Sequence, residues 1–370
     1  MIPPNLFSYA TSELSQDAFI CWLVAWANVP DHPLGDVGRA FVRLLLEVDL
    51  GESVDAQVPV TVTCGPKRQH YQTDVYFRAT VGKRERSFIL EDKTLGSPNT
   101  KRLNERRDNI RGTRPKDELF SCIYFKTGFL YPADRDVVKH GYSILDAERL
   151  HHFLVNHAEG VDSEICQAYI AHLHDAYVQP QRDDYPALLA GRVSLLERAP
   201  VQWQFMTSLR EKLLISLPVE LRTHPFEIRG VRRGTSRGRP WTQLDVGSVD
   251  GVLDGLNERL FYRVDRRKAG YYVALRQWSG VMGKPAAKAV KLDRLRQHRK
   301  AVRNLEDMTP LKLGHPTGDH QGHQESEILV LFLGTDNSPA AVLDGLPAFH
   351  QQLIVALRAA DLEAPRPSEA

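Results

Sequence analysis

The segment "FILEDKTLG", residues 88–96, runs from three apolar residues directly into Glu91, Asp92 and Lys93. The apolar run predicts a buried strand that ends at these charged residues. Side chains alternate along a strand, so Glu91 and Lys93 share one face and Asp92 points to the other. A carboxylate beside an ammonium at a strand end suits metal and phosphate chemistry. The alternative is a strand that reaches the protein surface and ends in solvated charges.

A second acid favours the chemical interpretation. Asp74 opens the run "DVYFRAT", and only a short turn separates this run from "RSFILEDK". The two runs are therefore expected to pair as antiparallel strands, which places Asp74 beside Glu91 and Lys93. Two carboxylates and a backbone carbonyl form the hard oxygen site that Mg²⁺ prefers. With a lysine beside it, such a site suits the hydrolysis of a phosphodiester.

The hydrophobic pattern divides the chain into two halves. In the first half the order is helix, three strands, helix, strand, helix; helices are expected at 14–28, 37–48, 99–111 and 144–158, and strands at 57–63, 73–80, 86–93 and 119–128. The pattern weakens over residues 178–191, where a linker is expected. The predicted domains are residues 1–178 and 195–360.

The second half repeats this coarse order. Helices are expected at 201–214, 288–305 and from 338, with Ser338 as the N-cap and Pro339 in the first turn; strands are expected at 226–233, 241–248, 260–267, 271–278 and 326–334. The repeated order leaves open whether the second half is a degenerate copy of the first. We expect an α/β first domain and an α/β or α+β second domain.

Composition adds a charge asymmetry. The net charge is only +2, but residues 222–303 hold 20 basic and 7 acidic side chains. This surplus favours nucleic acid as a partner over a solvated surface that binds nothing, and we expect Arg232, Arg233, Arg237 and Arg239 to contact phosphates. Tyr271, Tyr272 and Trp278 beside basic residues are either base-stacking side chains or core.

The chain has the composition of a soluble protein. No apolar run reaches the roughly 20 residues that span a bilayer. The four cysteines form no CxxC pair and the start of the chain lacks a signal-peptide pattern. A cytoplasmic protein without a membrane partner is therefore expected.

The spacing of Asp74 before Glu91-Asp92-Lys93 resembles the D…ExK signature of the PD-(D/E)xK nuclease superfamily, which has the restriction-endonuclease-like fold. The segments "NLFSYATSELSQDAFICWLVAWA", "FILEDKT" and "IYFKTG…GYSIL" are together similar to a bacterial branch of it. In the second half, "GRPWTQL", "YYVALRQW" and "ESEILVLFL" resemble its C-terminal region. The resemblance implies a mixed sheet flanked by helices.

The resemblance also implies a site. Asp74, Glu91 and the main-chain carbonyl of Asp92 would bind Mg²⁺ or Mn²⁺, Lys93 would be the catalytic lysine, and Glu13 would face the metal, usually through water. Gln16 and Asp17 share the helix face of Glu13 or form a cap. The helix after the lysine departs from the superfamily's usual pattern, since residues 102–106 read Arg-Leu-Asn-Glu-Arg. Its basic side chains, Arg106 among them, are expected to meet phosphates.

The implied function is a metal-dependent endonuclease that prefers DNA, cuts as a homodimer and acts in bacterial defence against foreign DNA. Two alternatives remain. One is a nucleic-acid-binding module with an inactive nuclease fold, and the other is an RNA-directed nuclease with the same metal chemistry.

Overall fold

The computed structural model describes residues 5–8, 13–70, 72–223, 225–236, 238–249, 257–279, 285–316, 324–334 and 336–363. Its contacts divide the chain into unit 1, Met1–Gln181, and unit 2, Arg182–Ala370. The division falls within residues 178–191, where a linker is expected, and the chain there forms helix α6, Gln179–Leu189. Pro186 lies within that helix, and it is one of the residues that make the segment resemble a break.

Unit 1 is built on one five-stranded sheet in the order β1-β2-β3-β4-β5. The strand β2 is antiparallel to both β1 and β3, whereas β4 runs parallel to β3 and β5 parallel to β4. The elements in chain order are α1 Glu13–Trp26, α2 Pro33–Leu50, β1 Val60–His70, β2 Thr73–Val81, β3 Arg84–Lys93, α3 Thr100–Gly112, β4 Leu119–Lys126, β5 Ser143–Asp146, α4 Ala147–His157 and α5 Glu164–Leu173, with shorter 3₁₀ helices at Leu6–Ser8 and Pro132–His140 and a π-helical turn at His174–Val178.

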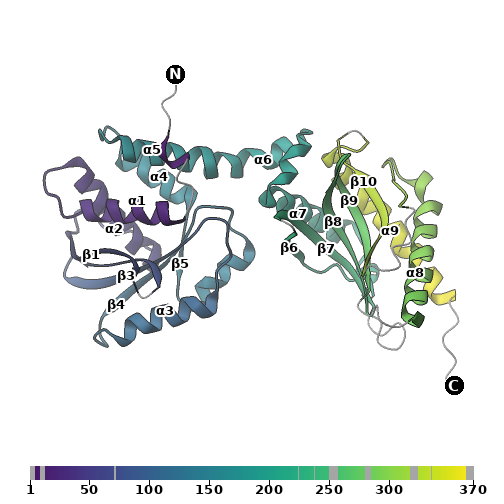
Figure 1. The fold of residues 1–370 in the computed structure, drawn as a ribbon, viewed down its shortest axis with the longest axis horizontal. Coiled ribbons are helices and arrows are strands. Elements are labelled where there is room, and N and C mark those ends of the chain that lie inside the picture. The colour runs from purple at the N-terminus through teal and green to yellow at the C-terminus, as the bar shows by residue number, and fades with distance from the viewer. Residues whose placement is uncertain are drawn as a thin grey trace. The chain divides into compact units, whose positions relative to one another are not determined.

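The helices of unit 1 cover both faces of this sheet, with α1 and α2 on one face and α3 on the other (Figure 1). The larger core lies on the α1–α2 side and includes Phe88 and Leu90 of β3. The smaller core lies on the α3 side and includes Ile89. Since β3 buries alternate residues against both layers, its sequence reads as the continuous apolar run of a central strand.

Helix α1 comes very close to α2 at Gly38. A Cβ atom there would lie 2.6 Å from the carbonyl oxygen of Leu23, so only glycine fits. This close approach holds α1 against the sheet, and α1 carries Glu13, Gln16 and Asp17 in its first turns.

One strand of unit 1 is not expected from the sequence. The prediction for residues 144–158 is a single helix, but the structure forms β5 at Ser143–Asp146 and starts α4 at Ala147. Asp146 ends the strand and caps the helix, its side chain accepting from the backbone N–H of Arg149 at 2.9 Å. A four-residue strand beside a parallel partner is too short to produce its own periodic pattern.

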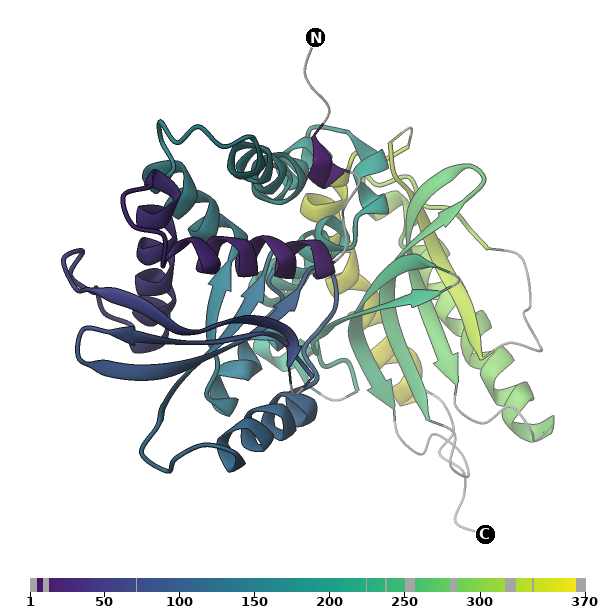
Figure 2. The same ribbon diagram turned by 60° about the vertical axis from the view of Figure 1, so that its left-hand side comes forward.

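Unit 2 contains a second five-stranded sheet, ordered β10-β9-β8-β7-β6 and antiparallel throughout. Figure 2 shows this sheet with the α8 and α9 helices beside it. Its elements are α7 Ala199–Ser216, β6 Val231–Ser236, β7 Arg239–Val249, β8 Glu258–Arg267, β9 Gly270–Ser279, α8 Pro285–Asn304, β10 Glu325–Phe332 and α9 Pro339–Glu363, with 3₁₀ turns at Val193–Glu197, Val219–Arg222 and Glu306–Met308.

The two sheets differ in topology. In unit 1 the strand that follows helix α3 is β4, which pairs with β3 in parallel. In unit 2 the strand that follows helix α8 is β10, which pairs with β9 in the antiparallel direction. The similar order of elements in the two halves therefore does not extend to strand direction. The described part of the chain is mixed α/β, with two sheets.

The last helix is the only described one long and apolar enough to cross a membrane, over Pro339–Ala359, and half of that stretch is buried. Its apolar residues, among them Leu346, Phe349 and Leu353, belong to the core of unit 2. The predicted N-cap is confirmed, because Ser338 Oγ accepts from the N–H of Ala341 at 3.0 Å. The packing of α9 is that of a core helix of unit 2.

Candidate active site

The ends of β2 and β3 bring Asp74 and Asp92 together. The strands pair as predicted, with Val75 opposite Leu90, and the backbone N–H of Asp92 donates to Asp74 Oδ2 at 2.9 Å. This hydrogen bond fixes the carboxylate of Asp74 at the end of β3. Gln69 of β1 also donates to Asp74, through Nε2 to Oδ1 at 3.2 Å.

The ammonium of Lys93 contacts four oxygens of the site. Its Nζ lies 3.2 Å from Asp74 Oδ2 and 3.3 Å from each of Glu91 Oε1 and Glu13 Oε2. It also donates to the main-chain carbonyl of Asp92. Burial alone would lower the pKa of Lys93, but the neighbouring carboxylates outweigh it and raise the pKa above its ordinary value. All four oxygens that the sequence assigned to the site therefore converge on one cation.

Helix α1 is tied to the chain just after Lys93. Glu13 Oε1 accepts from the backbone N–H of Thr94 at 3.1 Å, and Gln16 Nε2 donates to Thr94 Oγ1 at 2.6 Å. Gln16 is thus a positioning side chain at the strand end rather than a helix cap, and nothing in the local sequence indicates its contact, which spans 78 residues.

Two further carboxyl groups lie buried under the site. Asp92 is fully buried and Asp17 is 1% exposed; both oxygens of Asp92 and Oδ1 of Asp17 have no hydrogen-bond partner among the described residues. Burial, with a smaller contribution from Asp74, raises the pKa of Asp17 to about 7. Burial, followed by Asp17 and Glu13, raises the pKa of Asp92 well above its usual range. The side chain of Asp92 points away from Glu91, as strand alternation predicts, but into the interior.

Arg106 of α3 does not extend into solvent. Its NH1 lies 2.6 Å from Glu91 Oε1 and also contacts Oε2, and only 5% of the Glu91 side chain is exposed. Burial and Asp74 raise the pKa of Glu91, while Lys93 and Arg106 oppose that rise. Arg106, which is expected to contact phosphate, therefore pairs with Glu91, a predicted metal ligand.

Lys126, at the end of β4, has a structural role. The sequence leaves open whether this strand-end lysine is structural or faces a phosphate, and the structure buries it completely, where it donates to the carbonyl of Gly96 and lies 3.9 Å from Asp134. Its ammonium is enclosed and cannot reach a substrate phosphate. It supports the loop after β3 instead.

The geometry of the carboxylates is compatible with a shared ion. Since Lys93 Nζ lies 3.2 Å from Asp74 Oδ2 and 3.3 Å from Glu91 Oε1, these two oxygens are at most 6.5 Å apart. In the described part of the chain, no three His, Cys, Asp or Glu side chains are already arranged as a metal site. The donors are nevertheless the hard oxygens that Mg²⁺ and Mn²⁺ take. Three carboxylates, those of Asp74, Glu91 and Glu13, contact two cations, Lys93 and Arg106, and a divalent cation would offset the remaining negative charge.

Three of the four arginines assigned to nucleic acid lie on β6 and β7, the two strands of one hairpin of unit 2. Arg232 and Arg233 are neighbours on β6 and so point to opposite faces, and Arg232 pairs with Asp245. Arg239 is exposed at the start of β7, and Arg237 lies outside the described residues.

The aromatic residues predicted to stack bases or fill the core are largely enclosed. Tyr271 is 8% and Tyr272 3% exposed, and arginine side chains lie over both rings and over Trp278. The core interpretation is therefore the better description of the two tyrosines.

Comparison with known proteins adds no relative: no family model, no curated protein and no solved structure matches this chain significantly.

Proposed function

We propose that unit 1 is a metal-dependent endonuclease of the PD-(D/E)xK type, with DNA as the favoured substrate. The observation that carries the proposal is the convergence of Asp74, Glu91, Glu13 and the Asp92 carbonyl on Lys93 at one end of β2 and β3. A mixed sheet with helices on both faces is also what the resemblance implies.

In this proposal each residue has one role. Asp74, Glu91 and the Asp92 carbonyl hold Mg²⁺ or Mn²⁺, which supplies charge stabilisation and an activated water when bound. Lys93 provides a fixed positive charge beside the scissile phosphate. Glu13 orients Lys93 and the strand end through its contacts with Lys93 Nζ and the Thr94 N–H.

A nucleic-acid-binding module with an inactive site is the second candidate. The observation that favours it is that Lys93 and Arg106 both pair with Glu91, so the protein's own cations occupy the carboxylate of a proposed metal ligand. A cytoplasmic location, a homodimer and a role against foreign DNA belong to the proposal through the resemblance.

The decisive experiment is incubation with plasmid, linear duplex, single-stranded DNA and RNA, each with Mg²⁺, Mn²⁺ or EDTA. Cleavage should require the metal and should disappear in Asp74→Ala and Glu91→Ala, because each change removes a ligand. Asp162→Ala, an exposed acid of the same unit, should cut like wild type. Absence of cleavage with every substrate and metal would leave the inactive module, and cleavage of RNA alone would reassign the substrate.

A further inference from the structure

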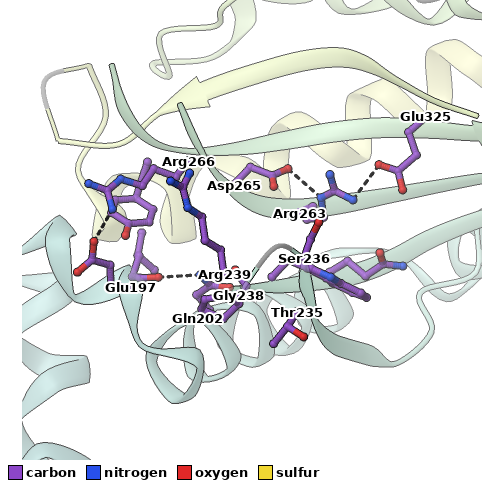
Figure 3. A pocket seen from close by; sticks show the side chains of 15 residues that line it. Glu197, Gln202, Thr235, Ser236, Gly238, Arg239, Arg263, Asp265, Arg266 and Glu325 are labelled. Carbon is purple, nitrogen blue, oxygen red and sulfur yellow. Dashed lines mark hydrogen bonds and ion pairs between the residues drawn. The ribbon is translucent and has the colours of Figure 1, made fainter. Parts of the chain in front are cut away.

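Unit 2 contains a cleft that the nuclease proposal does not use. It has a volume of about 1080 Å³, near the upper end for small-molecule sites, and it lies between the β6–β7 hairpin and the β8–β9 end of the sheet (Figure 3). A smaller hollow of about 320 Å³ adjoins it, and Arg239 and Arg266 line both.

The two hollows differ in chemistry. The smaller one is lined by Arg239, Arg266, Arg267, Lys268 and Gly270, four cations with no acid among the lining residues. Arg266 and Arg267 are paired with Glu197 and Glu327, whereas no ion pair involves Arg239 or Lys268 within the described chain. Both of these side chains are exposed. A compact group of cations in a concavity selects a ligand with several negative charges close together.

The larger cleft offers a ring surface and amides. The indole of Trp241 lies against Gly234, where a Cβ atom would come within 2.4 Å of the ring, so glycine is needed there to leave room for it. Gln202 lines the cleft, and only 2% of it is exposed. Its Nε2 donates to the carbonyls of Leu196 and Pro240. Its Oε1 has no hydrogen-bond partner among the described residues. An unpartnered acceptor beside an aromatic ring suits a heterocycle that carries an N–H group.

The charged floor of the cleft is already balanced. Arg263 lies 2.8 Å from both Asp265 and Glu325, and both ion pairs are drawn as dashed lines in Figure 3. Arg276 contacts the same two acids. The floor is thereby held rigid, and the net positive charge that remains is that of Arg239 and Lys268 at the junction with the smaller hollow.

We propose that this cleft binds a nucleoside di- or triphosphate, with the base against Trp241 and Gln202 Oε1 and the phosphates among Arg239, Arg266, Arg267 and Lys268. The same chemistry is present in a free nucleotide and in the triphosphorylated 5′ end of a nucleic-acid strand. The inference does not depend on the nuclease activity, because it concerns residues of unit 2 alone.

Calorimetry on the full chain in EDTA tests it with ATP, GTP, CTP and UTP, with the matching mono- and diphosphates, and with oligonucleotides that carry a 5′-triphosphate or a 5′-hydroxyl. At least one nucleotide should bind saturably at one site per chain, and affinity should rise from mono- to triphosphate. The double variant Arg239→Ala/Lys268→Ala should weaken binding by about tenfold or more, since it removes two charge-assisted contacts. The control Arg296→Ala/Lys300→Ala, two exposed cations of α8, should bind like wild type.

Binding of the triphosphorylated strand alone would support the site and identify the strand end as its ligand. The inference is overturned if no compound binds saturably at millimolar concentration, if mono- and triphosphates bind equally, or if the double variant binds like wild type. It is also overturned if the 5′-hydroxyl strand binds as well as the triphosphorylated one, since the surface would then recognise nucleic-acid backbone. Circular dichroism of each variant checks the fold, and both altered side chains are exposed and carry no packing.

Discussion

Replacing Asp17 by asparagine should change how the stability of unit 1 depends on pH. Burial, with a smaller contribution from Asp74, raises the pKa of this carboxyl group from 3.8 to about 7. The folded state therefore holds a proton that the unfolded state has already lost between about pH 4 and about pH 7. The free energy of unfolding must fall as pH rises through this window, and the loss is complete above the folded pKa.

The magnitude follows from the size of the shift. A rise of about three pKa units corresponds to roughly 4 kcal/mol in the free energy of unfolding, of which about 2.5 kcal/mol is lost between about pH 5 and about pH 8. The asparagine side chain cannot titrate, so the decline over this range should be smaller by that amount in Asp17→Asn. The absolute stability is a poorer measure, because the new amide is also buried and its unmade hydrogen bonds cost about 1–3 kcal/mol.

The assay is urea unfolding in EDTA at several pH values, with the transition of unit 1 identified by hydrogen exchange of peptides from α1 and β3. Asp162→Asn, an exposed acid of the same unit, controls for the loss of a charge. If Asp17→Asn retains the full wild-type decline with pH, Asp17 is not the buried protonated group that the structure describes, and the account of the acid cluster is refuted.

Three further predictions concern the same unit. If the proposed nuclease is active, Lys93→Ala should lower the initial rate of plasmid cleavage by about 10²–10³-fold. Asp92→Asn should lower that rate only slightly, because only the carbonyl of Asp92 faces the site. A larger loss of rate in Asp92→Asn than in Lys93→Ala would show that the two faces of the strand are misassigned. Arg106→Met should lower the free energy of unfolding of unit 1 by about 2 kcal/mol, less than for a fully buried pair because Arg106 is partly exposed. Mn²⁺ should restore more stability to this variant than to wild type. Equal stabilisation of both proteins by Mn²⁺ would argue against a shared ion. Gly38→Ala should lower the free energy of unfolding in urea by about 1–3 kcal/mol, because the new methyl group pushes α1 away from α2. The control Gly112→Ala, at a helical glycine with open space around it, should be neutral or stabilising. Equal effects of the two changes would contradict a close contact between the helices.

The sequence by itself determined the features that depend on neighbouring residues. Strand periodicity and the short turn were enough to pair β2 with β3 and to place Asp74 at the end of β3 beside Glu91 and Lys93, whose Nζ lies 3.2 Å from Asp74 Oδ2. The same alternation placed Glu91 and Lys93 on one face. These are consequences of backbone geometry over a short stretch of chain, and they hold whatever the rest of the chain does.

Only the tertiary structure decided which distant groups meet. Glu13 reaches Thr94 across 81 residues of sequence, and Arg106 turns inward to Glu91 because α3 packs over the face of β3 that carries it. In unit 2 the count of basic residues did not reveal that many arginines are paired with acids on other strands of the sheet, as Arg276 of β9 is with Glu325 of the adjacent β10. A pattern along the chain records which residues are apolar or charged. The partner of a buried charge is instead set by the packing of whole elements. That packing also leaves carboxyl oxygens of Asp17 and Asp92 without a hydrogen-bond partner among the described residues.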